Sequence, residues 1–398
     1  MYAVKILHKI LKEKLPFVHK SRLSCLMLAV ETLLRHNKLS LVALGRNILN
    51  NISARDNIKK IDRLLGNKHL YKELVYFYKE IANLCLKDVV KPWILIDWSC
   101  LSSQTNLYML RATLVLAGRS IVLYEEVHPK KFENNHSVHK KFLNTLKSIL
   151  PPSSSPIIVT DAGFRALWFK YVVFMGWDFV GRLRNKNLIK INGSKEWVLS
   201  STFYAVATNV ETYIGEGLLT QAGMVRCNFS IFKGEKKNRK KLNKNKTKSR
   251  GKKSVNYSKS SNEPWLIVSS LEYGEQLALK MVTIYSTRMQ IEESIRDTKS
   301  QHGFRLKESL SRSPARVSIL LLIGAIASLL CWLAGIQAKK KNLLSKYQTS
   351  SSKFTNKLST VFLGKEVLKR NLKITKKQFF SLFEILRSIR LKSCYLAF

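Results

Sequence analysis

The apolar residues of positions 1–86 recur at helical spacing, and no convincing strand pattern interrupts them. This pattern predicts a helical domain over residues 1–88. Two short helices are expected within it, at 38–47 and 53–65, each opening on a serine suited to capping the first turn. Joined by a turn around Asn50, the two would form a helix-turn-helix.

The second helix of this pair concentrates basic side chains at Arg55, Lys59, Lys60 and Arg63, and Asn57 is expected to project with them. These residue types suit contacts with phosphates and base edges. A basic, solvated helix pair within a bundle has the same composition. The concentration of charge on one helix favours DNA contact.

From position 93 the pattern changes to short apolar runs separated by helical segments, which predicts a mixed α/β sheet with helices on its faces. The fold class is therefore α/β. The expected strands are WILIDWSC (93–100), a hairpin at 107–116 and 120–128, PIIVTDAGF (156–164), WDFVGRLR (177–184) and PWLIVSSL (264–271), with helices at 138–149, 165–175 and about 275–300.

Residues 187–262 break this alternation. They contain two β-like runs, WVLSSTFYAVA and MVRCNFSIF, followed by a tract rich in Lys, Asn and Ser. Between Lys233 and Lys259 thirteen residues are basic and one is acidic, so this tract holds +12 of the net charge. A disordered basic loop and an arm that binds the DNA backbone both fit this composition.

These changes of pattern divide the chain into five expected segments. They are a helical DNA-binding domain (1–88), a first part of the core (89–186), an inserted β-rich segment with the basic tract (187–262), a second part of the core (263–338) and a helical C-terminal region for dimerisation or DNA contact (339–398).

Positions 317–338 contain no charged residue and are long enough to span a bilayer. Basic residues flank this stretch on both sides, so the positive-inside rule gives no orientation. A central helix enclosed on all sides by a soluble domain has the same composition. This window by itself leaves membrane and core interpretations open.

The chain has 69 Lys and Arg residues against 26 Asp and Glu, a formal net charge of +43. Such an excess indicates a polyanionic partner, of which nucleic acid is favoured over an anionic membrane surface or an acidic protein. A Lys-rich composition also arises in AT-rich genomes.

The six cysteines lie far apart with no C-x-x-C pair, which argues against a zinc site and a disulfide framework and fits a reducing cytoplasm. His136 and His139 form the one close histidine pair and are expected to face solvent. No uncharged segment of sufficient length opens the chain, so a secretory signal peptide is not expected.

Two carboxylates lie within apolar strands of this basic chain, Asp97 inside WILIDW and Asp161 at the end of PIIVTD. A buried carboxylate is costly unless it is paired or bound to a metal. For either acid alone, an internal hydrogen bond is the ordinary explanation. Two such acids on strands of one sheet favour a shared site.

A third acid is selected by helical geometry. On a continuous helix, Tyr285, Arg288, Glu292 and Lys299 fall within about 60° of one another. This stripe presents an acid flanked by two cations and an aromatic hydroxyl. Glu293 and Asp297, the neighbouring acids, point elsewhere and are expected to form surface ion pairs.

The spacing Y-x2-R-x3-E-x6-K in YSTRMQIEESIRDTK (285–299) resembles the YREK signature of a family of bacterial insertion-sequence transposases. Further segments share this likeness: LGRN, KKIDRLLGN, LIDWS, LRATLVLAGRSIVLYE, IIVTDAGF and CWLAG. Together they resemble the insertion-sequence-ten branch, whose transposase moves the tetracycline-resistance composite transposon. The resemblance covers nearly the whole chain except the basic tract.

This resemblance implies an RNase H-like catalytic core interrupted by an insertion, with helical regions on either side. It implies that residues 317–338 form a core helix and that no membrane is involved. Its acidic triad corresponds to Asp97, Asp161 and Glu292, which would bind two Mg²⁺ ions, with Mn²⁺ as a substitute.

The resemblance also implies roles in DNA contact. Tyr285, Arg288 and Lys299 would hold DNA near the scissile phosphate, and Trp265 matches an aromatic on which a flipped base stacks, although a core tryptophan is an equal alternative. The implied partners are transposon terminal inverted repeats and target DNA, bound by a homodimer in the bacterial cytoplasm at the nucleoid.

Two hypotheses of different class follow. The first is a cut-and-paste DDE transposase, which cleaves the element's ends by hydrolysis and hairpin formation and joins their 3′-hydroxyls to target DNA. The second is a catalytically inactive DNA-binding remnant of such an element. Metal-dependent cleavage of the element's ends distinguishes the two hypotheses, because only the active transposase would show it. A membrane-anchored basic protein is a third reading and rests on positions 317–338 alone.

Overall fold

The computed structural model describes residues 1–102, 104–184, 187–235, 247, 251, 262–348 and 358–395. Most of the basic tract at 233–259 therefore lies outside the described residues. The chain forms two compact units. Unit 1 comprises Met1–Ser154 and Met289–Tyr395, and unit 2 comprises Ser155–Arg288. The two units are defined by the contacts within the folded chain. The division of the sequence into five segments stays a prediction.

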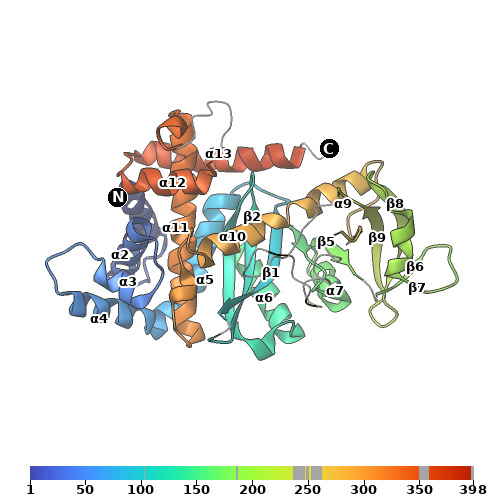
Figure 1. Ribbon diagram of the computed structural model, residues 1–398, viewed down its shortest axis with the longest axis horizontal. Helices are drawn as coiled ribbons and strands as arrows, with labels where there is room; N and C mark the ends of the chain where they lie inside the picture. The colour runs from blue at the N-terminus through green and yellow to red at the C-terminus, as the bar shows by residue number, and fades with distance from the viewer. Residues whose placement is uncertain are drawn as a thin grey trace. The chain divides into compact units, whose positions relative to one another are not determined.

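Unit 1 opens with five helices, in agreement with the helical pattern of the first 86 residues (Figure 1). Their buried positions recur every three or four residues, as the apolar spacing predicts. Side-chain caps fix several of their starts; the Asn67 carboxamide, for example, accepts the backbone N–H of Leu70 at 2.8 Å. The helices are α1 (Tyr2–Lys14), α2 (Lys20–His36), α3 (Leu41–Arg46), α4 (Ala54–Leu65) and α5 (Lys68–Leu86).

The predicted helix-turn-helix is present as α3 and α4, with two differences in detail. Ser53 caps α4 as expected, because its hydroxyl accepts the backbone N–H of Asp56 at 3.1 Å. Ser40 stands at the start of α3 without a side-chain capping bond. Asn57 does not project from α4, since it is 2% exposed and hydrogen-bonds into the preceding turn.

Three antiparallel strands of unit 1 lie in the order β3-β2-β1, followed in the chain by helix α6. The predicted hairpin is confirmed as β2 and β3, which are joined at Gly118 with φ of +78°. Their bounds are β1 (Trp93–Ser102), β2 (Leu107–Val115), β3 (Ser120–Pro129) and α6 (His136–Ile149).

The apolar segment at 317–338 is the middle of α11 (Pro314–Lys340), which opens on a Ser313 cap followed by proline. Among the described residues it is the one helix long and apolar enough to cross a membrane. All of its residues from Val317 to Ala338 except Ser328 are buried. It packs against α2, α5, α12 and β3 within unit 1, as a core helix does (Figure 1).

The C-terminal part of unit 1 is helical, as expected. The remaining helices of unit 1 are α10 (Met289–Lys299), α12 (Thr360–Lys369) and α13 (Lys376–Tyr395). Short 3₁₀ turns of unit 1 occupy Lys130–Phe132, between β3 and α6, and Leu306–Glu308 and Leu344–Lys346 in the C-terminal part.

The prediction of a single long helix at about 275–300 is wrong. The chain forms α9 (Leu277–Ser286) and then α10, with Thr287 and Arg288 between them. The break coincides with the boundary between unit 2 and unit 1. Apolar periodicity continues across this break, and for that reason the pattern does not reveal it. The stripe geometry inferred for Tyr285 to Lys299 therefore applies only to Glu292 and Lys299, which share α10.

Unit 2 contains a sheet in the order β4-β5-β10-β9-β8-β6-β7, in which β4 and β5 are parallel and the later pairs are antiparallel. The run WVLSSTFYAVA, expected as a strand, is mostly a 3₁₀ segment, whereas β8 was not anticipated. The bounds are β4 (Ile157–Thr160), α7 (Ala166–Phe174), β5 (Asp178–Leu183), β6 (Leu188–Ile191), β7 (Val198–Leu199), the 3₁₀ segment Ser200–Val206, β8 (Thr212–Leu219), β9 (Val225–Phe232) and β10 (Trp265–Ser269).

Helices α11 and α12 approach closely enough that their backbones touch. A Cβ on Gly364 would lie 1.7 Å from the carbonyl oxygen of Cys331, and one on Gly335 would lie 2.0 Å from that of Thr360. Glycine at both positions is therefore a requirement of the helix crossing.

We expect Gly364→Ala to lower the free energy of unfolding by about 1–3 kcal/mol, because the added methyl group must push α12 away from α11. Gly324→Ala is the matched control in α11, since its Cβ would meet only the flexible end of Leu39 at 3.2 Å. Thermal unfolding followed by circular dichroism compares the two. Equal stability of both variants would contradict the contact.

Candidate active site

Asp97 lies on β1 in a row of charged residues that crosses the strands of unit 1. The strand register places Asp97 opposite Arg111 on β2, and Arg111 opposite Glu125 on β3. Side chains that are directly opposite in antiparallel strands point to the same face of the sheet. Asp97, which is half-buried, is therefore beside a buried cation.

Arg111 connects this row to helix α10. Its guanidinium donates hydrogen bonds to Glu125 Oε2 at 3.1 Å, to Ser294 Oγ at 3.0 Å and to Thr298 Oγ1 at 3.0 Å. The side chains of Arg111 and Glu125 are each 1% exposed. Burial raises the pKa of Glu125, while the charge and hydrogen bond of Arg111 oppose that rise. The network fixes α10 against β3 and against β2, the strand next to β1.

Helix α10 carries Glu292 on its exposed surface and Lys299 two turns later. The Lys299 ammonium donates to Ser99 Oγ at 3.0 Å and to the carbonyl oxygen of Cys100, both on β1. Burial, followed by the charge of Lys307, lowers the pKa of Lys299. The negative charge of Asp97 acts in the opposite direction, so Asp97 is close enough to influence the ammonium group. Lys299 and Asp97 are thus neighbours within unit 1.

The neighbouring acids of α10 are engaged in ion pairs. Arg119 contacts Glu293 at 3.2 Å and Asp297 at 3.0 Å, and Arg296 also pairs with Glu293. The expectation that these two acids form ion pairs is confirmed. Glu292, the third acid of α10, is exposed.

In unit 2, Asp161 directly follows β4. Its Oδ1 accepts the backbone N–H of Gly163 at 2.8 Å, which orients the carboxylate at the end of the strand. Tyr285, at the end of α9, is 4% exposed. Burial raises its pKa, Arg288 and Arg182 oppose this, and the charge of Asp161 contributes to the rise. Asp161 and Tyr285 therefore lie close together in unit 2.

Trp265 opens β10 and is half-buried against two aromatic rings. Its ring lies 5.1 Å from that of Tyr285 in an edge-on arrangement and 5.9 Å from that of Phe232. Arg182 on β5 donates to the carbonyl oxygen of Pro264 at 3.1 Å and so anchors the start of the same strand.

Arg288 lies between α9 and α10 and is half-buried, and its backbone N–H is bonded to the carbonyl oxygen of Tyr285 at 3.0 Å. Tyr285, Arg288 and Trp265 share unit 2 with Asp161, whereas Lys299 shares unit 1 with Asp97 and Glu292.

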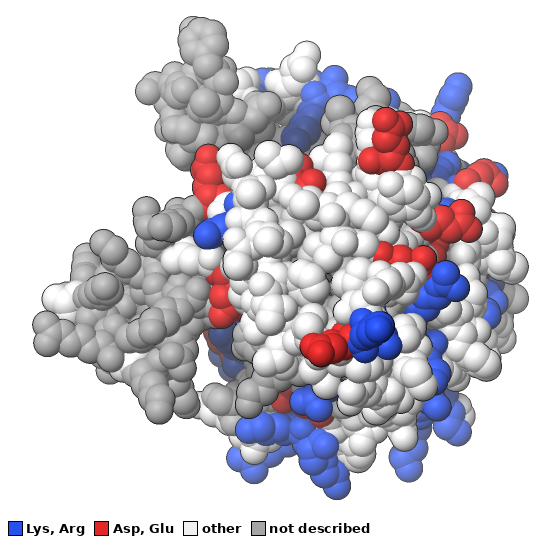
Figure 2. Space-filling model, turned by 90° about the vertical axis from the view of Figure 1, so that its right-hand side faces the viewer, with Lys and Arg blue, Asp and Glu red and all other residues white. Residues whose placement is uncertain are grey.

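The four basic residues predicted on α4 are exposed: Arg55, Lys59, Lys60 and Arg63. Lys59 makes one weak pair with Asp56 at 4.0 Å. The charge of the chain is distributed unevenly. Figure 2 shows the side of the molecule at the right of Figure 1, where acids and bases are interspersed and uncharged residues occupy the centre.

Asp97, Asp161 and Glu292 supply hard carboxylate oxygens, the donor type that Mg²⁺ and Mn²⁺ prefer. The donor chemistry thus fits a divalent ion. Over the part of the chain that the structure describes, no group of three His, Cys, Asp or Glu side chains is arranged to hold one. Asp97 and Glu292 belong to unit 1 and Asp161 to unit 2.

Two arginines at the site were not anticipated from the sequence. Arg111 and Arg182 each stand inside an apolar strand, LYMLRATLVL and WDFVGRLR. A charge within an apolar strand is the signal that selected Asp97 and Asp161. Applied to cations as well as acids, it would have found both arginines.

His139, expected to face solvent, is 6% exposed, which corrects that prediction. Its Nε2 accepts the indole N–H of Trp98 at 2.9 Å, which ties α6 to the strand residue after Asp97. Burial, followed by the charges of His136 and His128, lowers the pKa of His139 to about 4. The imidazole is therefore neutral at pH 7.

The mixed α/β fold, with Asp97 on β1 and Asp161 directly after β4, is consistent with an RNase H-like core, as expected. The profile of the transposase DDE domain matches residues 92–330, more than half of the chain, and the chain therefore belongs to the transposase DDE domain family. No curated protein matches the chain. The family assigns transposase activity on DNA, and the matched range contains all three acids of the proposed triad.

We expect Arg111→Met to lower the free energy of unfolding by about 3–5 kcal/mol, because it leaves the Glu125 carboxylate buried without its counter-charge. Arg111→Met combined with Glu125→Leu should recover much of that loss, since no lone charge remains. Denaturant unfolding of the single and double variants measures this difference. A double variant as unstable as the single one would show that the pair is not the source of the effect.

The pKa of His139 also predicts a pH dependence. In the unfolded chain the imidazole titrates near 6.5, and in the folded chain near 4, so protonation favours unfolding as the pH falls between these values. Between pH 7 and pH 5 the wild-type chain should lose about 1–2 kcal/mol more stability than His139→Gln. If the free energy of unfolding of both proteins changed equally with pH, a neutral buried imidazole would be ruled out.

Proposed function

We propose that the protein is a cut-and-paste transposase of a bacterial insertion sequence of the insertion-sequence-ten type. It binds the terminal inverted repeats, cleaves the ends by hydrolysis and hairpin formation, and joins the 3′-hydroxyls to target DNA. The observation that carries the proposal is the match to the transposase DDE domain over a range that contains Asp97, Asp161 and Glu292. The YREK spacing at 285–299 gives the finer assignment.

Asp97, Asp161 and Glu292 are proposed to hold two divalent ions. Mg²⁺, or Mn²⁺ in its place, supplies the positive charge and Lewis acidity that displacement at phosphorus requires. The chain's own residues orient these ligands. The Arg111 network holds α10 against β2, Lys299 ties α10 to β1, and the backbone N–H of Gly163 holds the carboxylate of Asp161.

The signature residues are proposed to position the DNA. The Lys299 ammonium is held on β1 near Asp97 and presents a point charge to a phosphate, and Arg288 can offer a planar, bidentate contact. Tyr285 is buried against Trp265, so its part is to support that ring. Trp265 would then stack on a flipped base when an end opens through a hairpin.

The remaining proposals concern partners and place. The exposed cations of α4 would contact terminal-repeat DNA, two ends would be paired by a homodimer, and the protein would act in the bacterial cytoplasm at the nucleoid. The net charge of +43 supports a nucleic-acid partner. The enclosed position of α11 supports a role without a membrane.

The test is metal-dependent cleavage of duplex DNA that carries the element's own ends. Asp97→Asn, Asp161→Asn and Glu292→Gln should each reduce cleavage at least about a hundredfold while DNA binding persists, because each removes a ligand charge and leaves the fold intact. Mn²⁺ binding to the protein–DNA complex, measured by calorimetry, should weaken in the same three variants.

Glu293→Gln is the matched control, because Glu293 neighbours Glu292 and is engaged by Arg119 and Arg296. It should cleave within a few-fold of the wild-type rate. End binding without cleavage by the wild-type chain would identify an inactive remnant. Unchanged cleavage by Asp97→Asn would remove that residue from the site.

A further inference from the structure

The turn of the helix-turn-helix exposes two apolar side chains at its tip. Leu49 is 73% exposed and Ile52 is 52% exposed, although Ile48 beside them is buried. Figure 1 shows this loop at the left edge of the view, where it leads into α4. The two large aliphatic side chains present a small apolar surface at the tip of the turn.

The turn that presents them is held rigidly. The Asn57 carboxamide donates to Asn50 Oδ1 at 2.8 Å and to the carbonyl oxygen of Ile52 at 3.2 Å, and Asn50 donates back to Asn57 at 3.2 Å. The backbone N–H of Ile52 adds a bond to Asn50 Oδ1 at 3.1 Å. A buried asparagine thus fixes the position of the exposed tip, which lowers the entropy lost on binding.

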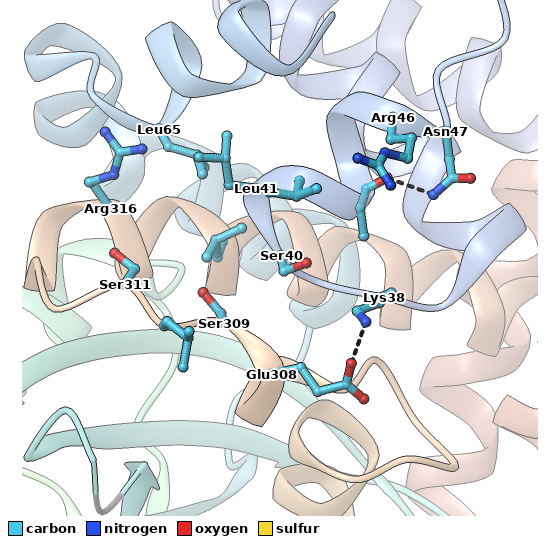
Figure 3. A pocket seen from close by; sticks show the side chains of 14 residues that line it. Lys38, Ser40, Leu41, Arg46, Asn47, Leu65, Glu308, Ser309, Ser311 and Arg316 are labelled. Atoms are coloured by element: carbon cyan, nitrogen blue, oxygen red, sulfur yellow. Dashed lines mark hydrogen bonds and ion pairs between the residues drawn. The ribbon is translucent and has the colours of Figure 1, made fainter. Parts of the chain in front are cut away.

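The helices on either side of the turn are fixed as well. A Cβ on Gly45 of α3 would lie 2.5 Å from the Cα of Ile58 on α4, so the two helices are in direct backbone contact. Figure 3 shows Arg46 and Asn47 at the end of α3, beside a cavity of about 600 Å³ that also contains the Lys38–Glu308 ion pair.

Exposed cations precede and follow the apolar tip along the chain. Arg46 precedes it, and Arg55 and Lys59 follow it in the first turns of α4; all three side chains are exposed. An apolar partner surface framed by cations suits a polyanion that carries apolar groups. In duplex DNA the thymine 5-methyl group is such a group, and it is displayed in the major groove between the phosphate backbones.

We propose that Leu49 and Ile52 read thymine methyl groups in the major groove of the DNA that α4 binds. The start of the second helix and the residues before it reach base edges in this geometry, while the cations contact phosphates. The proposal rests on the proposed function, because it assigns sequence preference to that same DNA-binding unit.

The experiment starts with the full chain and a library of duplexes with a randomised centre, from which the wild-type protein selects its preferred site. Dissociation constants are then measured for that site, for a scrambled duplex, and for the same site with deoxyuridine in place of thymidine. Loss of each contacted methyl group should weaken wild-type binding about fourfold. The double variant Leu49→Ser/Ile52→Ser should no longer respond to deoxyuridine.

Salt dependence separates base reading from backbone contact. The double variant should lose at least about tenfold of its preference for the selected site over the scrambled one, with an unchanged salt slope. Arg55→Ala/Lys59→Ala should instead reduce that slope by about two and weaken both duplexes alike. Val90→Ser, at an apolar residue that is 58% exposed, is the matched surface control and should match wild type.

Wild-type binding that is insensitive to deoxyuridine would overturn the proposal. This measurement uses only the wild-type protein, so it does not depend on whether a variant folds. A double variant that keeps its preference, or that changes only the oligomeric state, would also overturn it while leaving the proposed transposase activity intact. A wild-type chain that selects no sequence would overturn the reading role together with specific end binding, whereas cleavage after metal addition would still test the triad.

Discussion

The guanidinium of Arg111 joins β2 to β3 and to α10, because it hydrogen-bonds to Glu125, Ser294 and Thr298. A buried ion pair contributes little net stability, since desolvation offsets most of the attraction. Its value here is positional. It holds α10 in one register on the sheet, so that Glu292 and Lys299 have defined places relative to Asp97.

A second consequence of this arrangement concerns electrostatics. The proposed metal ligands are carboxylates in a chain of net charge +43, and Asp97 and Asp161 each lie near a signature residue of their own unit. Lys299 is beside Asp97, and Tyr285 with Arg288 is near Asp161. The signature residues and the acids thus occur as neighbours, which connects DNA positioning to the residues proposed for chemistry.

The helical part of unit 1 is held together by apolar packing around one buried helix. The core helix α11 is apolar on all sides and is covered by other helices and by β3, and Gly335 and Gly364 allow α12 to touch it. On the outside, α3 and α4 form a rigid pair whose surface combines cations with an apolar tip. Rigid presentation of a few side chains is what recognition of a DNA groove requires.

The sequence by itself determined the class of fold, most element positions and the candidate acids, because apolar period and charges inside apolar strands are local signals. It also identified Glu293 and Asp297 as ion-pairing residues. Only the tertiary structure decided that helix 275–300 is broken, that Asn57 and His139 are buried, and that Arg111 bridges β2 to α10. These facts depend on contacts between residues as far apart as Arg111 and Thr298, and no local period encodes such contacts.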